Sequence, residues 1–487
     1  MMNCLKQRWM SLLSLVLTVV IVACSTLPAE AATKAAPVLD ENFATASAAI
    51  LADANTVQYA AVLPSLPATD DGLMYVYALQ VYEYAIPAGA IPVATVAAST
   101  NPVVTFPLNH HQANTRLYSK FVLAVKQGGV MKMIAHGQFV RNPELLATHT
   151  HARAAHPLKG LQGVDFLNLD LQTNNTIIAS HLSRVTQVIC TGGDPAMVNP
   201  YAKVADAKPV PISLYMLNAN DAAAVNLLIT RMEYYASTSQ KCDDWIIGNE
   251  VNVRQWNYMS WQGWDQYMRQ YEQVFRIMYI AIKSNNANAN VYTCIDQNWD
   301  RNRPTSHAEY YQFMDGKDFL TKFAADMRLN GDIDWGVAHH PYTVPLTWAR
   351  FWNMSGCPSG SYMRNMITSN KMVSFQNLSV VTNFLQTPEM LSPTGTVRHY
   401  MISELGIANA QGGQVQAAAL CASYMAAARN PFVEQVIYSS ASSAGVDTTF
   451  TPEALGMFNN MDGAQSLAFQ QYAMSVIGIS DWGQVLR

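Results

Sequence analysis

Charge is scarce in this sequence, and neither sign dominates. Of its 487 residues, 13% are Asp, Glu, Lys or Arg, and the formal net charge is −4. Proteins that bind nucleic acid neutralise its phosphates with clustered Lys and Arg, and the sequence has no such cluster and no acidic tail. This composition excludes nucleic acid as a partner and favours a neutral substrate. Half of the residues are hydrophobic, which is enough to bury a large core.

Cysteine is also sparse, with seven in the whole chain. A disulfide scaffold or a zinc site repeats its cysteines and histidines at short, regular spacings, and these residues show neither pattern. The His110-His111 pair has no carboxylate or third histidine at ligand spacing. We therefore expect buried free thiols, no metal ion and no cofactor. The cysteines after the N-terminal region are Cys190, Cys242, Cys294, Cys357 and Cys421.

Long apolar runs are absent except near the N-terminus. There, basic residues precede an uncharged run over residues 10–23, which is too short to span a bilayer as a stable helix. We expect residues 1–31 to be an export signal and the protein to act outside the bacterial cytoplasm. Two cleavage sites compete. Residues 21–24 (IVAC) resemble a lipobox, in which Cys24 receives a lipid anchor, and residues 29–31 (AEA) suit ordinary signal peptidase.

Three segments follow the expected signal. Residues 32–55 are rich in Ala, Thr and Ser without a turn-bounded pattern, which predicts a linker. Residues 56–150 hold short β-branched and aromatic runs separated by Pro, Gly and Asn, a pattern typical of a small β-sandwich-like domain. From residue 158 to residue 487, short apolar runs alternate with longer helical stretches, which predicts a parallel α/β fold.

The third segment contains eight strand-like runs. Eight strands with helices between them favour a closed (β/α)8 barrel, the TIM-barrel fold, over an open sheet. In such barrels the functional residues collect where the strands end at their carboxyl side. The expected strands are 164–170, 185–190, 211–217, 244–249, 291–296, 334–339, 399–403 and 433–439.

Two of these strands end in a glutamate. Glu250 follows the apolar run of strand four, directly after Asn249, and Glu404 ends strand seven before a glycine. Strands four and seven lie across the mouth of an eight-stranded barrel, so we expect their terminal side chains to converge. Two facing carboxyl groups can cleave a glycosidic bond, because one protonates the leaving oxygen while the other attacks or stabilises the sugar cation.

Strand six adds His340 and Tyr342 beside this pair. Together with Asn249 and Glu250 after strand four and Glu404 after strand seven, these residues resemble the pattern of the clan A glycoside hydrolases, a large group of barrel enzymes. The resemblance implies a retaining mechanism in which Glu250 is the acid/base and Glu404 is the nucleophile. It also implies that Asn249 binds the sugar 2-hydroxyl and that the Tyr342 hydroxyl lies close to the nucleophile. For His340 we expect a contact with a sugar hydroxyl.

This resemblance covers residues 158 to 487, and the chain departs from it at the sugar platform. Many clan members end strand eight with a sugar-stacking tryptophan, where this chain has Tyr438. Trp299, at the end of strand five, or Trp352 in a later loop is our candidate to stack on the sugar, because flat apolar sugar faces pack on aromatic rings. Asn298, next to Trp299, is a candidate substrate contact.

A second resemblance is to a bacterial domain family without an assigned function. It rests on residues 245–252 (WIIGNEVN), 256–259 (WNYM), 298–299 (NW) and 335–342 (WGVAHHPY). Members of that family pair a β-rich N-terminal region with a barrel similar to those of clan A, which implies the same two-part organisation here.

The function we expect is that of a retaining glycoside hydrolase that cleaves an extracellular polysaccharide or oligosaccharide. Two alternatives stay open. One is a catalytically silent barrel that only binds carbohydrate. The other is a transglycosylase of envelope glycans, which would use the same two glutamates with water excluded from the second step.

Overall fold

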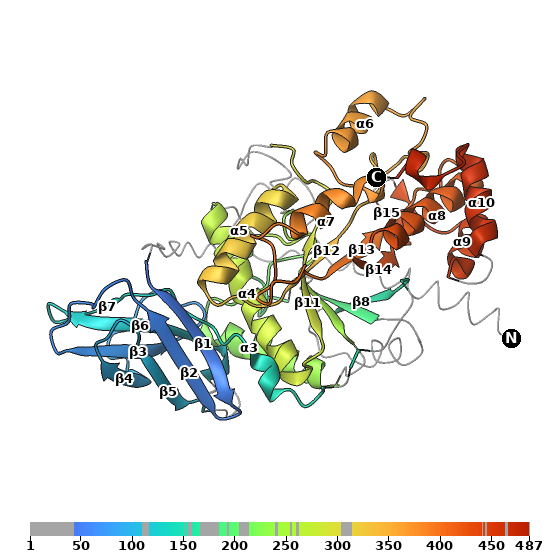
Figure 1. The fold of residues 1–487 in the computed structure, drawn as a ribbon. Helices are drawn as coiled ribbons and strands as arrows, with labels where there is room; N and C mark the ends of the chain where they lie inside the picture. Colours follow the sequence, from blue (N-terminus) through green and yellow to red (C-terminus); the bar gives the residue numbers. More distant parts are fainter. Residues whose placement is uncertain are drawn as a thin grey trace.

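A β-rich domain and an α/β body make up the protein, as the computed structural model shows (Figure 1). The expected signal segment, Cys24 and the His110-His111 pair lie outside the residues that the structure describes. None of the helices in the described part is long and apolar enough to cross a membrane. The structure describes residues 43–109, 116–150, 152–153, 158–165, 185–191, 194–203, 214–238, 242–253, 256–259, 263–302, 314–440, 442–443, 446–462 and 466–486.

Two antiparallel sheets form the β-rich domain. Buried and partly exposed side chains alternate along β2, so one face of its sheet covers the core. Phe106 and Phe121, one from each sheet, meet with ring centroids 5.1 Å apart. The first sheet has the order β1 (Ala46–Asp53), β2 (Thr56–Val62), β5 (Val103–Pro107), and the second β4 (Ala94–Ala97), β3 (Leu73–Leu79), β6 (Lys120–Gln127), β7 (Val130–Met133).

Strand β1 lies in the predicted linker, so the prediction of a linker over 32–55 is wrong for Ala46–Asp53. Ala49 and Leu51 are buried in the domain core, and the whole strand pairs with β2. A linker was predicted here because the segment is rich in alanine. Alanine has little strand preference of its own, and here the pairing with β2 and the burial of one face stabilise the strand.

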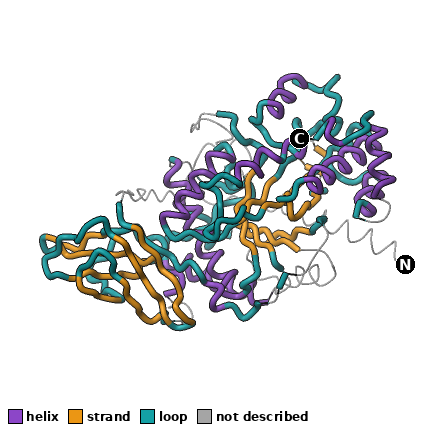
Figure 2. Tube along the Cα trace, in the orientation of Figure 1, coloured by secondary structure: helices purple, strands orange, loops and turns teal. Residues whose placement is uncertain are grey.

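Seven parallel strands form the central sheet of the α/β body (Figure 2). Their order in space follows their order in the chain. Beside the last strand, the Gly160 N–H donates to the Val436 carbonyl at 3.0 Å and the Val436 N–H donates to the Leu158 carbonyl at 2.8 Å. The residues that lead into β8 therefore bond to β14, so the two edges of the sheet curl towards each other. The strands are β8 (Leu161–Asp165), β9 (Val185–Ile189), β10 (Asp244–Ile247), β11 (Asn290–Ile295), β12 (Gly336–His339), β13 (Tyr400–Leu405) and β14 (Val433–Tyr438).

The strand predicted at 211–217 is wrong over its described part. Residues 214–217 form only isolated bridges, among them Tyr215 with Thr191, and β9 pairs directly with β10. Pro211, at the start of the predicted strand, has no N–H to donate to a neighbouring strand. The described sheet therefore has seven parallel strands in place of the expected eight, and a full (β/α)8 barrel stays a prediction.

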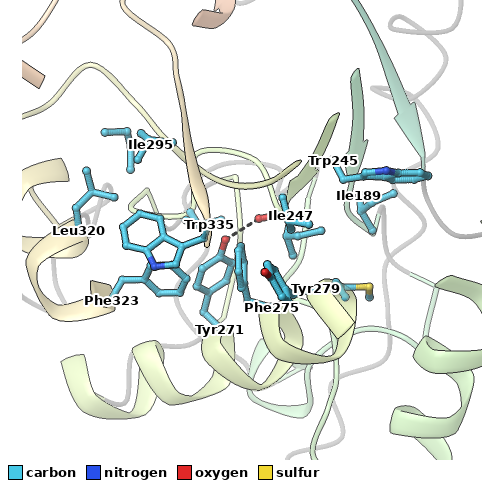
Figure 3. Close-up of a cluster of buried hydrophobic side chains, with 14 of the residues drawn as sticks. Ile189, Trp245, Ile247, Tyr271, Phe275, Tyr279, Ile295, Leu320, Phe323 and Trp335 are labelled. Carbon is cyan, nitrogen blue, oxygen red and sulfur yellow. Dashed lines mark hydrogen bonds between the residues drawn. The ribbon is translucent and has the colours of Figure 1, made fainter. Parts of the chain in front are cut away.

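Helices cover the outer face of this sheet, and the longest, α4, is buried along almost its whole length. Its Tyr271 hydroxyl donates to the Ile247 carbonyl at 2.8 Å, and Phe323 of α5 meets the Trp335 ring edge-on at 5.0 Å (Figure 3). The helices of the body are α3 (Ala222–Thr238), α4 (Trp264–Asn285), α5 (Gly316–Leu329), α6 (Gly360–Thr368), α7 (Ser379–Leu385), α8 (Gly413–Arg429), α9 (Pro452–Asn460) and α10 (Ser466–Ile477).

A separate cluster of side chains fills the inner face of the curled sheet. It includes the Cys294 thiol, which agrees with the prediction of buried free thiols, since all five cysteines of the described part are free and buried. The polar residues that follow these strands lie at their carboxyl ends, above the cluster. Its members are Ile246, Tyr292, Cys294, Ala338 and Met401.

The imidazole of His339, at the end of β12, makes stability depend on pH. Burial, reinforced by the charge of His340, lowers the pKa of His339 to about 3, and its Nδ1 pairs with the Tyr400 hydroxyl at 2.7 Å. In an unfolded chain the pKa of histidine is about 6.5. Between these two values the unfolded state binds a proton that the folded state does not. This residue therefore lowers the free energy of unfolding as the pH falls from about 6.5 towards 3, by roughly 1 kcal/mol per pH unit.

We predict that His339→Asn, which keeps a polar side chain near Tyr400, flattens this dependence. Urea unfolding followed by circular dichroism at pH 7.0, 6.0 and 5.0 measures it. The free energy of unfolding should fall less steeply with acidification in the variant than in the wild type. Equal slopes would show that His339 does not cause the effect.

Candidate active site

Glu250 lies in a tight turn directly after β10. Gly248 and Glu250 both have left-handed backbones, with φ of 78° and 40°. A side chain at position 248 would meet Val251 Cγ1 at 2.6 Å, so both the conformation and the space require glycine there. For Glu250 the conformation costs on the order of 1–3 kcal/mol. Its N–H donates to the Cys294 Sγ at 3.3 Å and helps to hold the turn.

An irregularity in β13 turns the Glu404 side chain towards the carboxyl ends of the strands, where Glu250 lies. Along this strand Met401 belongs to the inner cluster while Ile402 packs with the residues beneath the helices. Strict alternation would send Glu404 to the outer side with Ile402. The register with β14 shifts between Ile402 and Leu405, and a bulge of this kind re-aims a side chain. The Glu404 carboxylate accepts a 2.8 Å hydrogen bond from the Tyr342 hydroxyl.

His340 lies between the two glutamates. Its Nδ1 is 2.8 Å from Glu250 Oε1 and 3.6 Å from Glu404 Oε2. Two oxygens that share one nitrogen neighbour at these distances lie closer together than the roughly 6.5–9.5 Å at which inverting glycosidases hold their carboxyl groups. The structure therefore brings together the two predicted carboxylates and Tyr342 around one imidazole.

The charges around His340 and Tyr342 shift both groups. Burial by itself lowers the pKa of His340, but its neighbours Cys294, Glu404 and Glu250 outweigh burial, and the pKa lies well above its usual value. Burial and the charges of Glu404 and Glu250 hold the pKa of Tyr342 far above its usual range. The Tyr342 hydroxyl therefore keeps its hydrogen and donates it to Glu404.

The predicted sugar contact of His340 disagrees with this geometry. Its side chain is 2% exposed, Nδ1 faces Glu250, and Nε2 lies 3.3 Å from the Cys294 Sγ. Both ring nitrogens are thus engaged within the protein, and His340 links the carboxylates instead of facing the substrate. The predicted contact of Asn249 with the sugar 2-hydroxyl stays a prediction. Asn249 is half-buried beside Glu250, and its amide has no hydrogen-bond partner among the described residues.

Asn298 and Trp299 are both buried, and their contact with a substrate stays a prediction. The Asn298 amide donates to Asp296 and accepts from the Arg301 guanidinium at 2.7 Å. Trp299 is 4% exposed and packs edge-on against Phe384 of α7, with centroids 5.2 Å apart. Because β11 ends at Ile295, the alternation of side chains along this strand does not predict which way Asn298 and Trp299 point in the loop that follows.

Tyr438, in place of the tryptophan of many clan members, is held by aromatic contacts at the end of β14. Its ring stacks on Phe450 with centroids 4.5 Å apart and contacts Phe458 of α9. Trp352 is half-buried and packs edge-on against Phe351, at 5.0 Å.

Asn252 and Asp296 support the site, and sequence reasoning did not pair them. The Asn252 amide donates to Asp296 Oδ1 at 2.7 Å, and the Asp296 N–H donates back to Asn252 Oδ1 at 2.9 Å. This two-point contact ties the turn of Glu250 to the end of β11. Burial, followed by the charge of Glu250, raises the pKa of Asp296 to about 7. Each of the two residues follows an apolar strand, and this position is the sequence signal that could have suggested that they lie close together.

No group of three or more His, Cys, Asp or Glu side chains in the described part is arranged to hold a metal ion. The ionisable groups that the described part brings together here are the carboxyl groups of Glu250 and Glu404, the His340 imidazole, the Tyr342 phenol and the Cys294 thiol.

Residues 162–485 match the family model DUF5722, whose description is a family of unknown function, and the chain belongs to this family. No curated protein matches the chain. Similar solved structures include a β-glucosidase from Thermotoga maritima in complex with glucoimidazole, at 9% identity and a TM-score of 0.36, over 66% of this chain and 84% of that one. Another is a GH5-4 broad specificity endoglucanase from Clostridium acetobutylicum, at 14% identity and a TM-score of 0.34, over 63% and 77%. Scores of this size carry no argument about function.

The turn that carries Glu250 generates a prediction about Gly248. We expect Gly248→Ala to lower the free energy of unfolding by about 1–3 kcal/mol more than Gly395→Ala does, because only the former adds a clash. Gly395 is a matched control, since its φ is 77° and nothing lies within 4 Å of an added Cβ. Denaturant unfolding of the two variants measures the difference. Equal losses would mean that left-handed strain alone requires glycine at position 248.

Proposed function

We propose that this protein is a retaining O-glycoside hydrolase with a (β/α)8-type barrel, which cleaves a polysaccharide or oligosaccharide outside the cytoplasm. The observation that carries the proposal is the pair of carboxyl groups, from β13 and the turn after β10, that meet at one nitrogen of His340. The apolar run over residues 10–23 supports the exported location. A lipid anchor at Cys24 remains part of the proposal.

Glu404 suits the role of nucleophile. The Tyr342 hydroxyl donates to its carboxylate, and a hydrogen bond to the charged form favours ionisation. In the first step Glu404 attacks the anomeric carbon and forms a glycosyl ester, while Glu250 gives its proton to the departing oxygen. In the second step Glu250 takes a proton from water, the water oxygen attacks the same carbon, and Glu404 leaves as carboxylate. The anomeric configuration is retained.

Asn249 suits the binding of the sugar 2-hydroxyl. Its free amide lies next to Glu250, and a hydrogen bond to the 2-hydroxyl strengthens as the sugar ring flattens in the transition state. Such a bond lowers the barrier more than it strengthens ground-state binding.

The central prediction concerns azide rescue of the two glutamates. We expect Glu404→Ala and Glu250→Ala to abolish turnover of natural glycosides. With an activated aryl glycoside, azide should react in both variants. In Glu404→Ala it replaces the nucleophile, so the glycosyl azide has the opposite anomeric configuration to the substrate. In Glu250→Ala it attacks the glycosyl ester, so the configuration is the same. Proton NMR of the products distinguishes them.

The matched control is Glu389→Ala, which removes an exposed glutamate and should keep full activity. A panel of plant, algal and microbial glycans identifies a substrate first. Full activity in either site variant would overturn the assignment, and binding of glycans without any product would favour the silent carbohydrate-binding alternative.

Tyr342→Phe gives a second prediction. It keeps the ring and removes only the hydroxyl that donates to Glu404. A hydrogen bond to a charged group contributes about 1.5–3 kcal/mol, so we expect kcat to fall by roughly ten- to a hundred-fold. Steady-state kinetics on the same substrate measures this. A change in KM with unchanged kcat would contradict a role beside the nucleophile.

A further inference from the structure

The stretch of chain that holds β12, α6 and α7 differs in charge from the rest of the sequence. From residue 335 to residue 388 there is no Asp or Glu, although the whole chain has 34 of them. The same stretch has three cations, Arg350, Arg364 and Lys371, so its formal charge is +3 when histidine is neutral. The whole chain, at −4, favours a neutral substrate, but the local charge of this stretch is opposite in sign and favours an anion.

Helix α6 belongs to the connection that follows β12 (Figure 1). Its Met366 and Ile367 are buried in a cluster with Val344, two residues after Tyr342. Two hydrogen bonds with the side chain of Gln411, in the loop after β13, hold the same connection from the other side. The helix is therefore fixed at the carboxyl side of the sheet, where the two glutamates lie.

An open hollow of about 590 Å³ borders the exposed face of α6. Residues four apart lie on one face of a helix, which places Gly360, Arg364 and Thr368 along it. A Cβ at Gly360 would lie 2.7 Å from the Met354 carbonyl oxygen, so glycine lets the preceding loop approach the helix this closely. The polar side chains that line the hollow are those of Asn353, Ser355, Ser361, Arg364, Asn365 and Thr368.

The lining of this hollow suits a sugar that carries an anion. No Asp or Glu is among the lining residues, and the Arg364 guanidinium has no ion-pair or hydrogen-bond partner among the described residues. A planar guanidinium can bind two oxygens of one carboxylate at once, and a sulfate ester presents a similar pair. The amides of Asn353 and Asn365 can bind sugar hydroxyls. A volume of this order is typical of a site for a small ligand.

We propose that the hollow beside α6 is a subsite for a negatively charged sugar unit, whose carboxylate or sulfate binds Arg364. This inference rests on the proposed function, because it names the class of glycan that the two glutamates cleave. The charged unit lies against α6, away from the bond that is cleaved between Glu250 and Glu404. Contacts with such a remote unit are the same in the ground state and in the transition state, so they strengthen binding and lower KM.

The first test measures binding and needs no activity. Isothermal titration calorimetry on the full chain, with Glu404→Ala to prevent cleavage, compares two pairs of probes. One pair is galacturonate oligosaccharides before and after reduction of their carboxyl groups, and the other is sulfated galactan oligosaccharides before and after removal of sulfate. We expect one charged probe to bind about ten- to a hundred-fold more tightly than its neutral counterpart. The pair that shows the preference identifies the anion as carboxylate or sulfate. Equal binding within both pairs would overturn the proposal.

Variants of Arg364 show where the anion binds. Arg364→Ala should abolish the preference for the charged probe, and Arg364→Lys should restore part of it, because lysine keeps the charge but not the two-point contact. The matched control is Arg429→Ala, which removes an exposed cation at the end of α8 and should leave the preference unchanged. Equal losses in Arg364→Ala and Arg429→Ala would mean general electrostatic attraction and would contradict the subsite.

The second test is kinetic and uses chains with Glu404 intact. On the preferred charged chain, Arg364→Ala should raise KM about ten- to a hundred-fold and change kcat little. On an aryl glycoside of a single neutral sugar, which does not reach α6, neither constant should change. If Arg364→Ala cleaves every glycan as the wild type does, the proposed function stands and the subsite is wrong. Binding of the charged probe through Arg364 without cleavage by the wild type would support the subsite and contradict the proposed function.

Discussion

One nitrogen atom, Nδ1 of His340, lies against the carboxyl groups of both glutamates. Two ionised carboxylates about 5 Å apart repel each other by roughly 3 kcal/mol at an effective dielectric of about 20. The fold holds the carboxyl groups of Glu250 and Glu404 near one another against this repulsion. The N–H of His340 and the O–H of Tyr342 supply donors on the inner side of the pair. Because these donors are buried and their directions fixed, they offset the repulsion more than water would.

Several contacts stabilise the strained turn that orients the Glu250 side chain. A left-handed glutamate costs stability, and three contacts around it hold the turn in place. The Cys294 Sγ accepts the Glu250 N–H, the Val251 N–H donates to the Cys294 carbonyl at 2.8 Å, and Asn252 and Asp296 bond to each other in both directions. All three contacts come from Cys294 of β11 and from Asp296, which directly follows this strand. The Glu250 side chain is thus preorganised by its neighbouring strand, which would limit the reorganisation required if Glu250 is the acid/base of the proposed reaction.

Most strands of the central sheet, and the two carboxyl groups that follow them, could be predicted from the sequence because short apolar runs mark the strands. Six of the seven observed strands of the central sheet lie within two residues of a predicted strand at each end. The residues that follow β11 were harder to predict. Asn298 is tied by Asp296 and Arg301, and Trp299 turns back to α7, both through loop geometry that depends on contacts distant in the chain. The links of Cys294 to His340 and of Asn252 to Asp296 join residues more than 40 positions apart, which no local pattern reveals.

The β-rich domain has a physical role that its position defines. It covers α4, whose buried face includes Arg269 and Gln273, polar residues that a helix exposed to water would present to solvent. Lys120 and Arg269 both lie over the Tyr84 ring, at 4.1 and 4.7 Å from its centroid. The Phe139 N–H donates to the Asn330 carbonyl at 2.9 Å, just before β12 begins.

These contacts reach the side and the amino-terminal end of the sheet, whereas the glutamates lie at its carboxyl ends. The domain therefore stabilises the body from the end opposite the site. Hydrogen bonds from the Phe139 N–H and the Gln138 amide cross the boundary, so the domain is packed on the body.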